Sequence, residues 1–342
     1  MFAKRFAFIA ILLVFLIILV GYSVTLGTSD LSPGDAYRAL INSLFPGSFD
    51  LPERTTRIVM NIRAPRVLMA VFAGAALALG GCITQSILKN PLATPYTLGV
   101  SSGAGFGAAL AILFGIVIIP GIGGVVINAF VFSLIPVAVV VITSQFRKMT
   151  PMTIILCGVA MSYVFSASNT IFQFFGEPNA VKSVVFWMVG DLNEISLWNI
   201  SYVAIPMLTI FLISMYLAKD MNVMRMGDDT AKALGVRVEP IRVGSLLMAC
   251  LITAFVVSFT GSIGFVCLLA PTISRIFVGG EMQYLLPASA VMGACILTLA
   301  DMVAKTIIAP IMLPVGAITA LVGGPVLIFL LLSRGISSGV RN

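Results

Sequence analysis

Long apolar runs constrain this chain more than any other feature of its sequence. Ten windows of about twenty residues have the apolar content and length needed to cross a lipid bilayer. Inside hydrocarbon every backbone polar group must be paired, which only helices and closed β-barrels achieve. Barrels show short alternating segments instead of long apolar runs. The sequence therefore predicts an all-α integral membrane protein with about ten transmembrane helices.

The expected spans are 6–26, 64–84, 97–118, 123–144, 151–175, 197–218, 241–260, 263–278, 285–306 and 314–333. Two of them are irregular, because 97–118 is rich in Gly and Ala and 263–278 is short and contains Pro271. The glycines of the first, Gly99, Gly103, Gly105 and Gly107, are typical of close packing between membrane helices. We expect one transmembrane domain over 1–342, with residues 7–26 retained as a first helix rather than cleaved as a signal peptide.

Composition excludes several classes of function. The 342 residues are 59% hydrophobic and 10% charged, with no histidine and a net charge of +7. The missing histidine removes the commonest haem and zinc ligand and the usual proton shuttle. The five cysteines lie in apolar stretches without metal-ligand spacing, and no nucleotide-binding motif is present. We therefore expect no cofactor and no metal on this chain, no nucleic-acid partner and no enzymatic activity.

The distribution of basic residues predicts the orientation in the membrane. With ten spans and both termini in the cytoplasm, 13 of the 20 Lys and Arg residues fall inside, as cytoplasmic loops usually require. These are Lys4, Arg5, Lys89, Arg147, Lys148, Lys219, Arg225, Lys232, Arg237, Arg242, Arg275, Arg334 and Arg341. A multi-pass protein of the cell (inner, cytoplasmic) membrane is predicted. The outer segments 27–62 and 176–196 are too short for separate domains, and the second suits a helix at the interface.

One long charged segment, residues 218–242, interrupts the apolar spans on the inner side. Within it Asp228, Asp229 and Thr230 suit the start of a helix and Gly235 suits its end, which predicts a helix of about eight residues. So short a helix is marginal in water. By itself the pattern fits an ordinary solvated connector and a docking site for a partner about equally well.

The order of motifs resembles one transporter family. Residues 63–66 read Arg-Ala-Pro-Arg, 90–95 Asn-Pro-Leu-Ala-Thr-Pro, 98–105 Leu-Gly-Val-Ser-Ser-Gly-Ala-Gly, 299–301 Leu-Ala-Asp and 313–316 Leu-Pro-Val-Gly. With Ala-Leu-Gly-Val at 233–236 and Gly-Ser-Ile-Gly-Phe-Val at 261–266, this is similar to the permeases of ABC importers for ferric siderophores, haem and cobalamin, the FecCD/BtuC-like type II importers. The similarity covers about residues 55–335.

This resemblance implies a homodimer with the pathway between two copies, two separate ABC ATPase subunits that use ATP, and an extracytoplasmic substrate-binding protein. It implies that the cytoplasmic coupling segment 218–242 docks on the ATPases through Asp228, Asp229, Thr230, Ala231, Leu234 and Gly235. It also implies that Arg63, Arg66 and Lys305 meet acidic residues of the binding protein. Lys305 replaces the family's usual arginine, and Thr272 stands where the family commonly has a histidine.

Other expectations concern Asp301 and the pathway. Asp301 precedes Lys305 by four residues, so the two are predicted to form an ion pair along one helix. The alternative to docking is that Arg63 and Arg66 anchor their span at the membrane surface or pair with local acidic residues. The pathway is expected to be lined by Met161, Phe165, Phe172, Leu313 and Val315. Ferric siderophore is the first choice of substrate, with cobalamin or haem next. An ion-gradient-driven secondary transporter is the alternative function, although Asp301 is the only intramembrane charge to support it.

Overall fold

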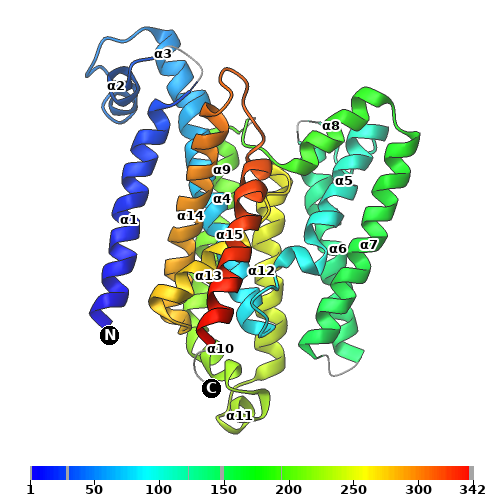
Figure 1. Ribbon diagram of the computed structural model, residues 1–342. Helices are drawn as coiled ribbons and strands as arrows, with labels where there is room; N and C mark the ends of the chain where they lie inside the picture. The colour runs from blue at the N-terminus through cyan, green and yellow to red at the C-terminus, as the bar shows by residue number, and fades with distance from the viewer. Residues whose placement is uncertain (1, 28–30, 122, 147–149, 194, 339–342) are drawn as a thin grey trace.

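The structure, a computed structural model, describes residues 2–27, 31–121, 123–146, 150–193 and 195–338. Arg147, Lys148 and Arg341, which entered the orientation argument, lie outside these ranges. The described residues fold into helices joined by short loops, so the predicted all-α class is confirmed. Ten of the helices stand side by side (Figure 1).

These ten helices coincide with the ten predicted spans. They are α1 (Phe2–Thr25), α4 (Ala64–Ile87), α5 (Val100–Phe114), α6 (Gly124–Phe146), α7 (Pro151–Phe175), α9 (Leu197–Tyr216), α12 (Val238–Thr260), α13 (Val266–Val278), α14 (Met282–Thr306) and α15 (Val315–Ser338). Seven are long and apolar enough to cross a membrane by themselves, whereas α5, α13 and α15 count as shorter apolar helices in the described residues. The two irregular spans, 97–118 and 263–278, are therefore real but short.

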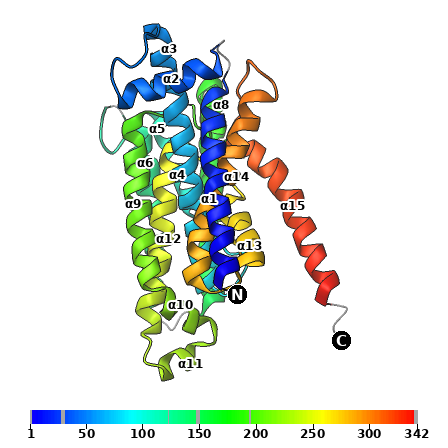
Figure 2. The ribbon, with the colours of Figure 1, turned by 90° about the vertical axis from the view of Figure 1, so that its left-hand side faces the viewer.

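The shorter elements gather at the two ends of the bundle. One end carries α2 (Pro33–Leu44), α3 (Glu53–Ile58) and α8 (Pro178–Val189), and the other carries α10 (Ala218–Arg225) and α11 (Asp228–Ala233) (Figure 1). The first described residues of the chain and the end of α15 lie at the α11 end (Figures 1 and 2). This is the arrangement that an even number of crossings produces. A 3-10 turn, η2 (Pro95–Leu98), precedes α5.

Glycine allows the closest helix contacts of the bundle. A Cβ on Gly74 of α4 would lie 2.4 Å from the carbonyl oxygen of Gly293 on α14. On α5, a Cβ at Gly103 or Gly107 would come within 2.5 Å of a carbonyl oxygen of α6. Small residues let membrane helices approach until their backbones touch, because no side chain stands between them. The expected packing role is confirmed for Gly103 and Gly107.

The helices form two groups. A larger one contains α1, α4, α9 and α12 to α15, while α5 to α8 stand together beside it (Figure 1). Helix α4 is the centre of the larger group, and nearly all its residues from Ala73 to Ile87 are buried. Helices α7 and α15 lie at the margin of the molecule and keep many exposed apolar side chains, among them Phe174 and Leu321. Figure 2 shows α15 leaning away from the other helices at its C-terminal end.

Candidate functional site

The inner charged segment folds into two short helices that project beyond the bundle. Helix α11 covers Asp228–Ala233, two residues shorter than expected, and lies farthest from the membrane helices (Figures 1 and 2). It ends as predicted at Gly235, whose φ of +83° is left-handed. The amide of Val236 donates to the carbonyl of Ala231 at 2.9 Å and that of Gly235 to Lys232 at 3.0 Å. This pair of bonds is a Schellman motif, which satisfies carbonyls left open at a helix end.

The six predicted coupling residues divide into two sets. Asp229, Thr230, Leu234 and Gly235 are exposed, and the Leu234 side chain keeps 65% of its surface in solvent. Ala231 is fully buried against the bundle, and Asp228 is only partly exposed. An exposed leucine at the tip of a projecting helix is a feature that a partner surface can cover. Asp228 and Ala231 instead attach α11 to its own chain.

Asp228 is the main electrostatic attachment. One of its carboxylate oxygens accepts a hydrogen bond from Lys89 Nζ at 2.9 Å, and the other accepts one from Arg242. Lys89 follows the end of α4 and Arg242 lies in the first turns of α12. Burial acts to raise the pKa of Asp228, but the hydrogen bonds from Arg242 and Lys89 outweigh it and lower the pKa below the ordinary carboxyl value. Asp228 therefore attaches α11 to the residues just after α4 and to the first turns of α12.

Helix α10 makes a second attachment, to the start of α14. The Asn222 side chain accepts a hydrogen bond from the amide of Met282 at 2.8 Å, and Arg225 donates to the carbonyl of Gly280. Asn222 thereby satisfies one of the amides that the first turn of α14 leaves open. The charged segment is thus held to α4, α12 and α14, three neighbouring helices of the bundle. It is a rigid attachment rather than a loose connector.

At the opposite end of the bundle, three basic side chains line one cavity, and two of them share the carboxylate of Asp301. Arg66 Nε donates to Asp301 Oδ1 at 2.6 Å, and Lys305 Nζ lies 2.6 Å from Asp301 Oδ2. The predicted Asp301–Lys305 pair is confirmed, and Arg66 has a local acidic partner, which was one of the alternatives to docking. Arg63 donates to the carbonyls of Val24 and Thr25, where a cation complements the negative end of α1.

Local backbone geometry brings Arg63 and Arg66 to this point. Residues Val59–Arg63 form a π-helical turn, η1, which joins α3 to α4 in one continuous helix. Pro65 has no N–H, so it cannot donate the regular bond to the preceding turn, and the amide of Ala64 bonds to Val59 instead. The wider turn changes the direction in which Arg63 points. A proline two residues after Arg63 is therefore the sequence signal for this site.

The three predicted docking residues line a cavity of about 160 Å³ together with Leu26, Gly27, Ile58, Ile62 and Met312. Each basic side chain is at least 96% buried, so none stands at the open surface. The cavity reaches the surface beside Ile62, which is about half exposed. Docking through Arg63, Arg66 and Lys305 stays a prediction, and in this conformation a partner could reach them only by inserting a side chain. Anchoring at the membrane surface is unsuited to side chains so fully enclosed.

The five predicted pathway residues differ in how far they are exposed. Met161, Phe165 and Phe172 are on α7, whereas Leu313 lies just before α15 and Val315 is its first residue. Phe165 and Val315 are buried within the subunit, and Phe165 and Phe172 both pack on Phe106 of α5. The pathway role of the five residues stays a prediction, and in this conformation Phe165 and Val315 are covered by their own subunit. Met161, Phe172 and Leu313 keep part of their surface exposed.

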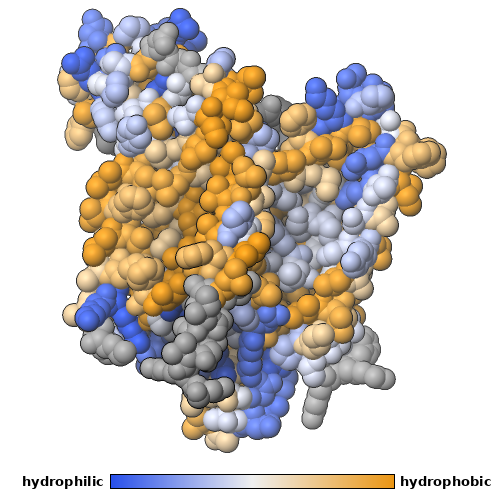
Figure 3. All heavy atoms as spheres, viewed as in Figure 1, coloured by the Kyte–Doolittle hydropathy of each residue, from blue (hydrophilic) through white to orange (hydrophobic). Residues whose placement is uncertain are grey.

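Polar side chains instead form a stripe along α7. Ser162, Ser166, Thr170 and Gln173 follow at helical spacing and are half-buried or exposed. The hydroxyls of Ser162 and Thr170 donate to carbonyls of their own helix, which lowers the cost of facing a weakly polar space. Figure 3 shows a pale region between α15 and α7, in contrast to the strongly apolar surface over α1 and α14. The spacing of hydroxyl residues in an apolar span was the signal that our sequence reasoning missed.

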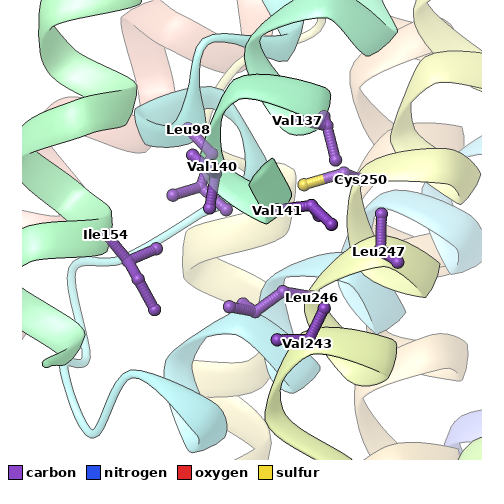
Figure 4. A pocket seen from close by; sticks show the side chains of 9 residues that line it. All are labelled: Leu98, Val137, Val140, Val141, Ile154, Val243, Leu246, Leu247 and Cys250. Carbon is purple, nitrogen blue, oxygen red and sulfur yellow. The ribbon is translucent and has the colours of Figure 1, made fainter. Parts of the chain in front are cut away.

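Neither the small pocket between α6 and α12 nor Thr272 forms a binding site. The pocket between α6 and α12 has a volume of about 20 Å³ and a wholly apolar lining, which includes Val137, Leu246 and Cys250 (Figure 4). It is large enough for about one water molecule and lacks the polar partners that a water needs. Thr272, in place of the family histidine, is buried and donates to the carbonyl of Leu268 at 2.7 Å. Its hydroxyl is thereby satisfied within α13.

Comparisons with known proteins agree with this arrangement. The FecCD transport family matches residues 12–333. The Fe(3+) dicitrate transport system permease protein of Escherichia coli strain K12 is 35% identical, with 80% of this chain and 85% of that protein covered. The cobalamin import system permease protein of Halobacterium salinarum is 36% identical, with 93% and 86% covered. A solved structure of an inward-facing conformation, assigned to the metal-chelate type of ABC transporter, superimposes with a TM-score of 0.83 at 29% identity, covering 95% of this chain and 98% of that one.

Proposed function

The chain belongs to the FecCD transport family, and from this premise we propose that it forms the translocation pathway of an ATP-driven importer for a metal chelate, as one of two identical subunits. It is a membrane-spanning ABC importer permease, and its relatives are permease subunits rather than enzymes. Two observations support the proposal together. The family matches residues 12–333 of this chain, and the helices of this chain superimpose on those of a metal-chelate ABC transporter.

The homodimer is supported by the surfaces of α7 and α15. Both helices lie at the edge of the subunit, and α7 exposes the polar stripe Ser162, Ser166, Thr170 and Gln173. A face turned to lipid is expected to be apolar all round, because hydroxyl groups gain no partner from acyl chains. A second copy placed across this face encloses a weakly polar space instead. The exposed apolar residues of α15, such as Phe329, supply surface that the same partner can cover.

Two ABC ATPase subunits are the proposed partners at the α11 end. The projecting helix presents Asp229, Thr230, Leu234 and Gly235, while Asp228 and Ala231 hold it to the bundle. A rigid lever of this kind can pass a two-state motion of the ATPases to α4, α12 and α14. In this proposal α11 and both chain termini lie in the cytoplasm, and the protein is located in the cell (inner, cytoplasmic) membrane.

A matched pair of variants tests the coupling role. Leu234→Glu places a charge on the exposed tip of α11, where burial against a partner would cost several kcal/mol. Uptake into proteoliposomes should fall at least tenfold while membrane insertion and thermal stability stay unchanged. Ile119→Glu makes the same change at a 54% exposed position of the opposite end and should leave uptake intact. Equal uptake by the two variants would contradict the docking of α11.

Ferric siderophore is the proposed substrate, with cobalamin or haem next. Sequence similarity does not select among them, since relatives named for ferric dicitrate and for cobalamin are 35% and 36% identical. A weakly polar conduit suits a bulky chelate that is recognised chiefly by the extracytoplasmic binding protein. The decisive experiment reconstitutes the permease with its ATPase and binding protein and measures uptake of ferric siderophore, haem and cobalamin in parallel. Uptake that persists without ATPase, driven by an ion gradient, would favour the secondary transporter.

The binding protein is proposed to dock at the end that carries α2, α3 and α8, with acidic side chains directed at Arg66 and Lys305. The cavity beside Ile62 is the route by which such a side chain reaches them. Opposite charges across such an interface mainly set the orientation and the rate of association.

A further inference from the structure

Three segments of the chain meet at the C-terminal end of α8. The amide of Asp191 donates to the carbonyl of Thr260 at 2.8 Å, and the amide of Gly316 donates to the carbonyl of Gly190 at 3.1 Å. These bonds join the end of α8 to the end of α12 and the start of α15. We call this meeting point the α8 junction. Helix α8 and helix α15 both border the pale face between α15 and α7, so the junction lies at the outer end of the proposed pathway (Figure 3).

Glycines make the α8 junction a close backbone contact. A Cβ on Gly316 would lie 1.8 Å from the carbonyl oxygen of Val189, and one on Gly190 would lie 2.6 Å from that of Ser262. Gly190 also has a φ of +82°, which favours glycine. Because no side chains separate the segments, a small displacement of residues 190–193 is passed directly to α15. Backbone contacts of this kind do not deform continuously.

Asn193 connects the α8 junction to the buried charge cluster. Its amide nitrogen Nδ2 donates to Asp191 Oδ2 at 2.6 Å, and its backbone N–H donates to Asp191 Oδ1 at 2.6 Å. Its remaining side-chain atom, Oδ1, accepts a hydrogen bond from Arg66 Nη1. The reverse orientation of the amide would set oxygen against the Asp191 carboxylate and nitrogen against the guanidinium. Asn193 is therefore held in a fixed geometry between Asp191 and Arg66.

The Arg66 guanidinium is incompletely satisfied. Its Nε is bound to Asp301, and its Nη1 is shared between Asn193 Oδ1 and the Met312 sulfur at 3.3 Å, a weak acceptor. Its Nη2 has no hydrogen-bond partner in the described residues, although the side chain is 97% buried. Lys305 lies in the same cavity wall, and Asp301 is shared between these two cations. Within the part of the chain that the structure describes, the edge formed by Nη1 and Nη2 therefore lacks an anionic acceptor.

We propose that a carboxylate bound to the Nη1–Nη2 edge of Arg66 displaces Asn193 and thereby releases the α8 junction. The inference rests on the docking proposed above, with an acidic side chain of the extracytoplasmic partner as the source. A carboxylate matches the planar edge of arginine with two parallel, charge-assisted bonds, which are about twice as strong as bonds to a neutral amide oxygen. The cavity of about 160 Å³ holds roughly five times the volume of one water molecule, about 30 Å³, and so admits a carboxylate side chain.

Asn193 and Asp191 are thereby positioning residues for transport. While the cavity is empty, they hold the end of α8 and the start of α15 in place. Docking of the partner occupies Arg66, and the outer end of the pathway is then free to rearrange. Docking of the binding protein is in this way coupled to a structural change at the outer end of the permease.

The test measures hydrogen–deuterium exchange of segments 187–193 and 314–318 in nanodiscs of zwitterionic lipid. The variant Asn193→Ala removes the hydrogen bond to Arg66 and leaves Arg66, Asp301 and Lys305 themselves unsubstituted. Loss of a hydrogen bond to a charged group should speed exchange of both segments about tenfold or more. The control Asn199→Ala changes a half-buried outer asparagine, for which no side-chain hydrogen bond is described, and should leave exchange unchanged. Unchanged exchange in Asn193→Ala would overturn the proposed link.

The ligand arm uses a short peptide that contains two glutamates, beside the same peptide with glutamines. The acidic peptide should speed exchange of both segments in the wild type and have no further effect on Asn193→Ala, while the glutamine peptide has none. No response of the wild type to the acidic peptide overturns the carboxylate site. A response produced by anionic phospholipid alone would assign the site to a lipid phosphate and refute the protein source. Failure of ATP-driven uptake with an intact exchange response would instead refute the proposed function only.

Discussion

Asp301 offers the strictest test of how charge is arranged inside this bundle. Its side chain is fully buried and is the shared partner of Arg66 and Lys305, which are 3% exposed each. Two ion pairs at about 4 Å between charge centres are each worth about 4 kcal/mol at an effective dielectric constant near 20, before the cost of desolvation. After desolvation is subtracted, the net contribution of these ion pairs to stability is small. Removing one partner is costly, because it leaves a buried charge without a counter-charge.

Replacing Asp301 and replacing Lys305 should therefore have unequal effects. Asp301→Asn leaves two buried cations without a counter-charge and should cost about 3–5 kcal/mol, the range found when one partner of a buried pair is removed. Lys305→Met keeps the Arg66–Asp301 pair, removes the surplus cation and fills the space with a side chain of similar length. Its expected cost is below about 1.5 kcal/mol, since no charge is left unpaired.

The assay is thermal unfolding of the purified variants in one detergent or nanodisc composition. At roughly 2 °C per kcal/mol for a chain of this size, Asp301→Asn should lower the midpoint by about 6–10 °C and Lys305→Met by less than about 3 °C. The double variant Asp301→Asn with Lys305→Met should recover part of the loss. Equal effects of the two single variants, or a larger effect of Lys305→Met, would refute the view that Asp301 is a shared counter-ion.

Three further outcomes follow from packing and charge elsewhere. Gly81→Ala places a Cβ 1.7 Å from the carbonyl oxygen of Cys267 and should lower stability by about 1–3 kcal/mol or more, whereas Gly244→Ala in α12 meets open space and should be neutral or stabilising in the same unfolding assay. The ion pairs with Arg242 and Lys89 lower the pKa of Asp228 below the ordinary carboxyl value of about 3.9. The stability that these pairs add is therefore complete above that ordinary pKa and is lost as the pH falls through the lowered pKa of Asp228. Proteolysis of segment 226–237 should accordingly be independent of pH from 7 to 5 and rise only below about 4, and Asp228→Asn should abolish that dependence. Finally, Cys157 is the one partly exposed cysteine and the other four are buried, so a membrane-permeant maleimide should label Cys157 first in the folded protein; equal labelling of all five by mass spectrometry would contradict the packing.

Helix α11 shows how much of a local structure can be predicted from neighbouring residues. The acidic residues Asp228 and Asp229 mark the start of α11 and Gly235 marks its end. These local signals predicted both ends of the helix to within two positions. Its attachment could not be predicted in the same way. Lys89 and Arg242 lie 139 and 14 residues from Asp228, and only the folded bundle brings the three together.

The pathway residues illustrate the opposite limit. Hydropathy placed α7 almost to the residue, because lipid imposes a length and an apolar content on any spanning helix. In a membrane, however, both lipid-facing and protein-facing sides are apolar, so the pattern does not say which side is open. Our choice of Phe165 fell one residue from the exposed stripe at Ser166, and only the packing of α7 on α5 distinguishes them.

The apolar runs by themselves determined the fold class, the ten helices and their positions, because the absence of water in a bilayer leaves the backbone no alternative to the helix. The ordered motifs determined the resemblance to a transporter family. The tertiary structure alone decided that Arg66 and Lys305 share Asp301 inside the subunit, that Asn193 connects this cluster to the end of α8, and that α11 is held to α4 and α12. Charges in a low-dielectric interior must find partners wherever the chain brings them close, and sequence distance carries no information about that choice.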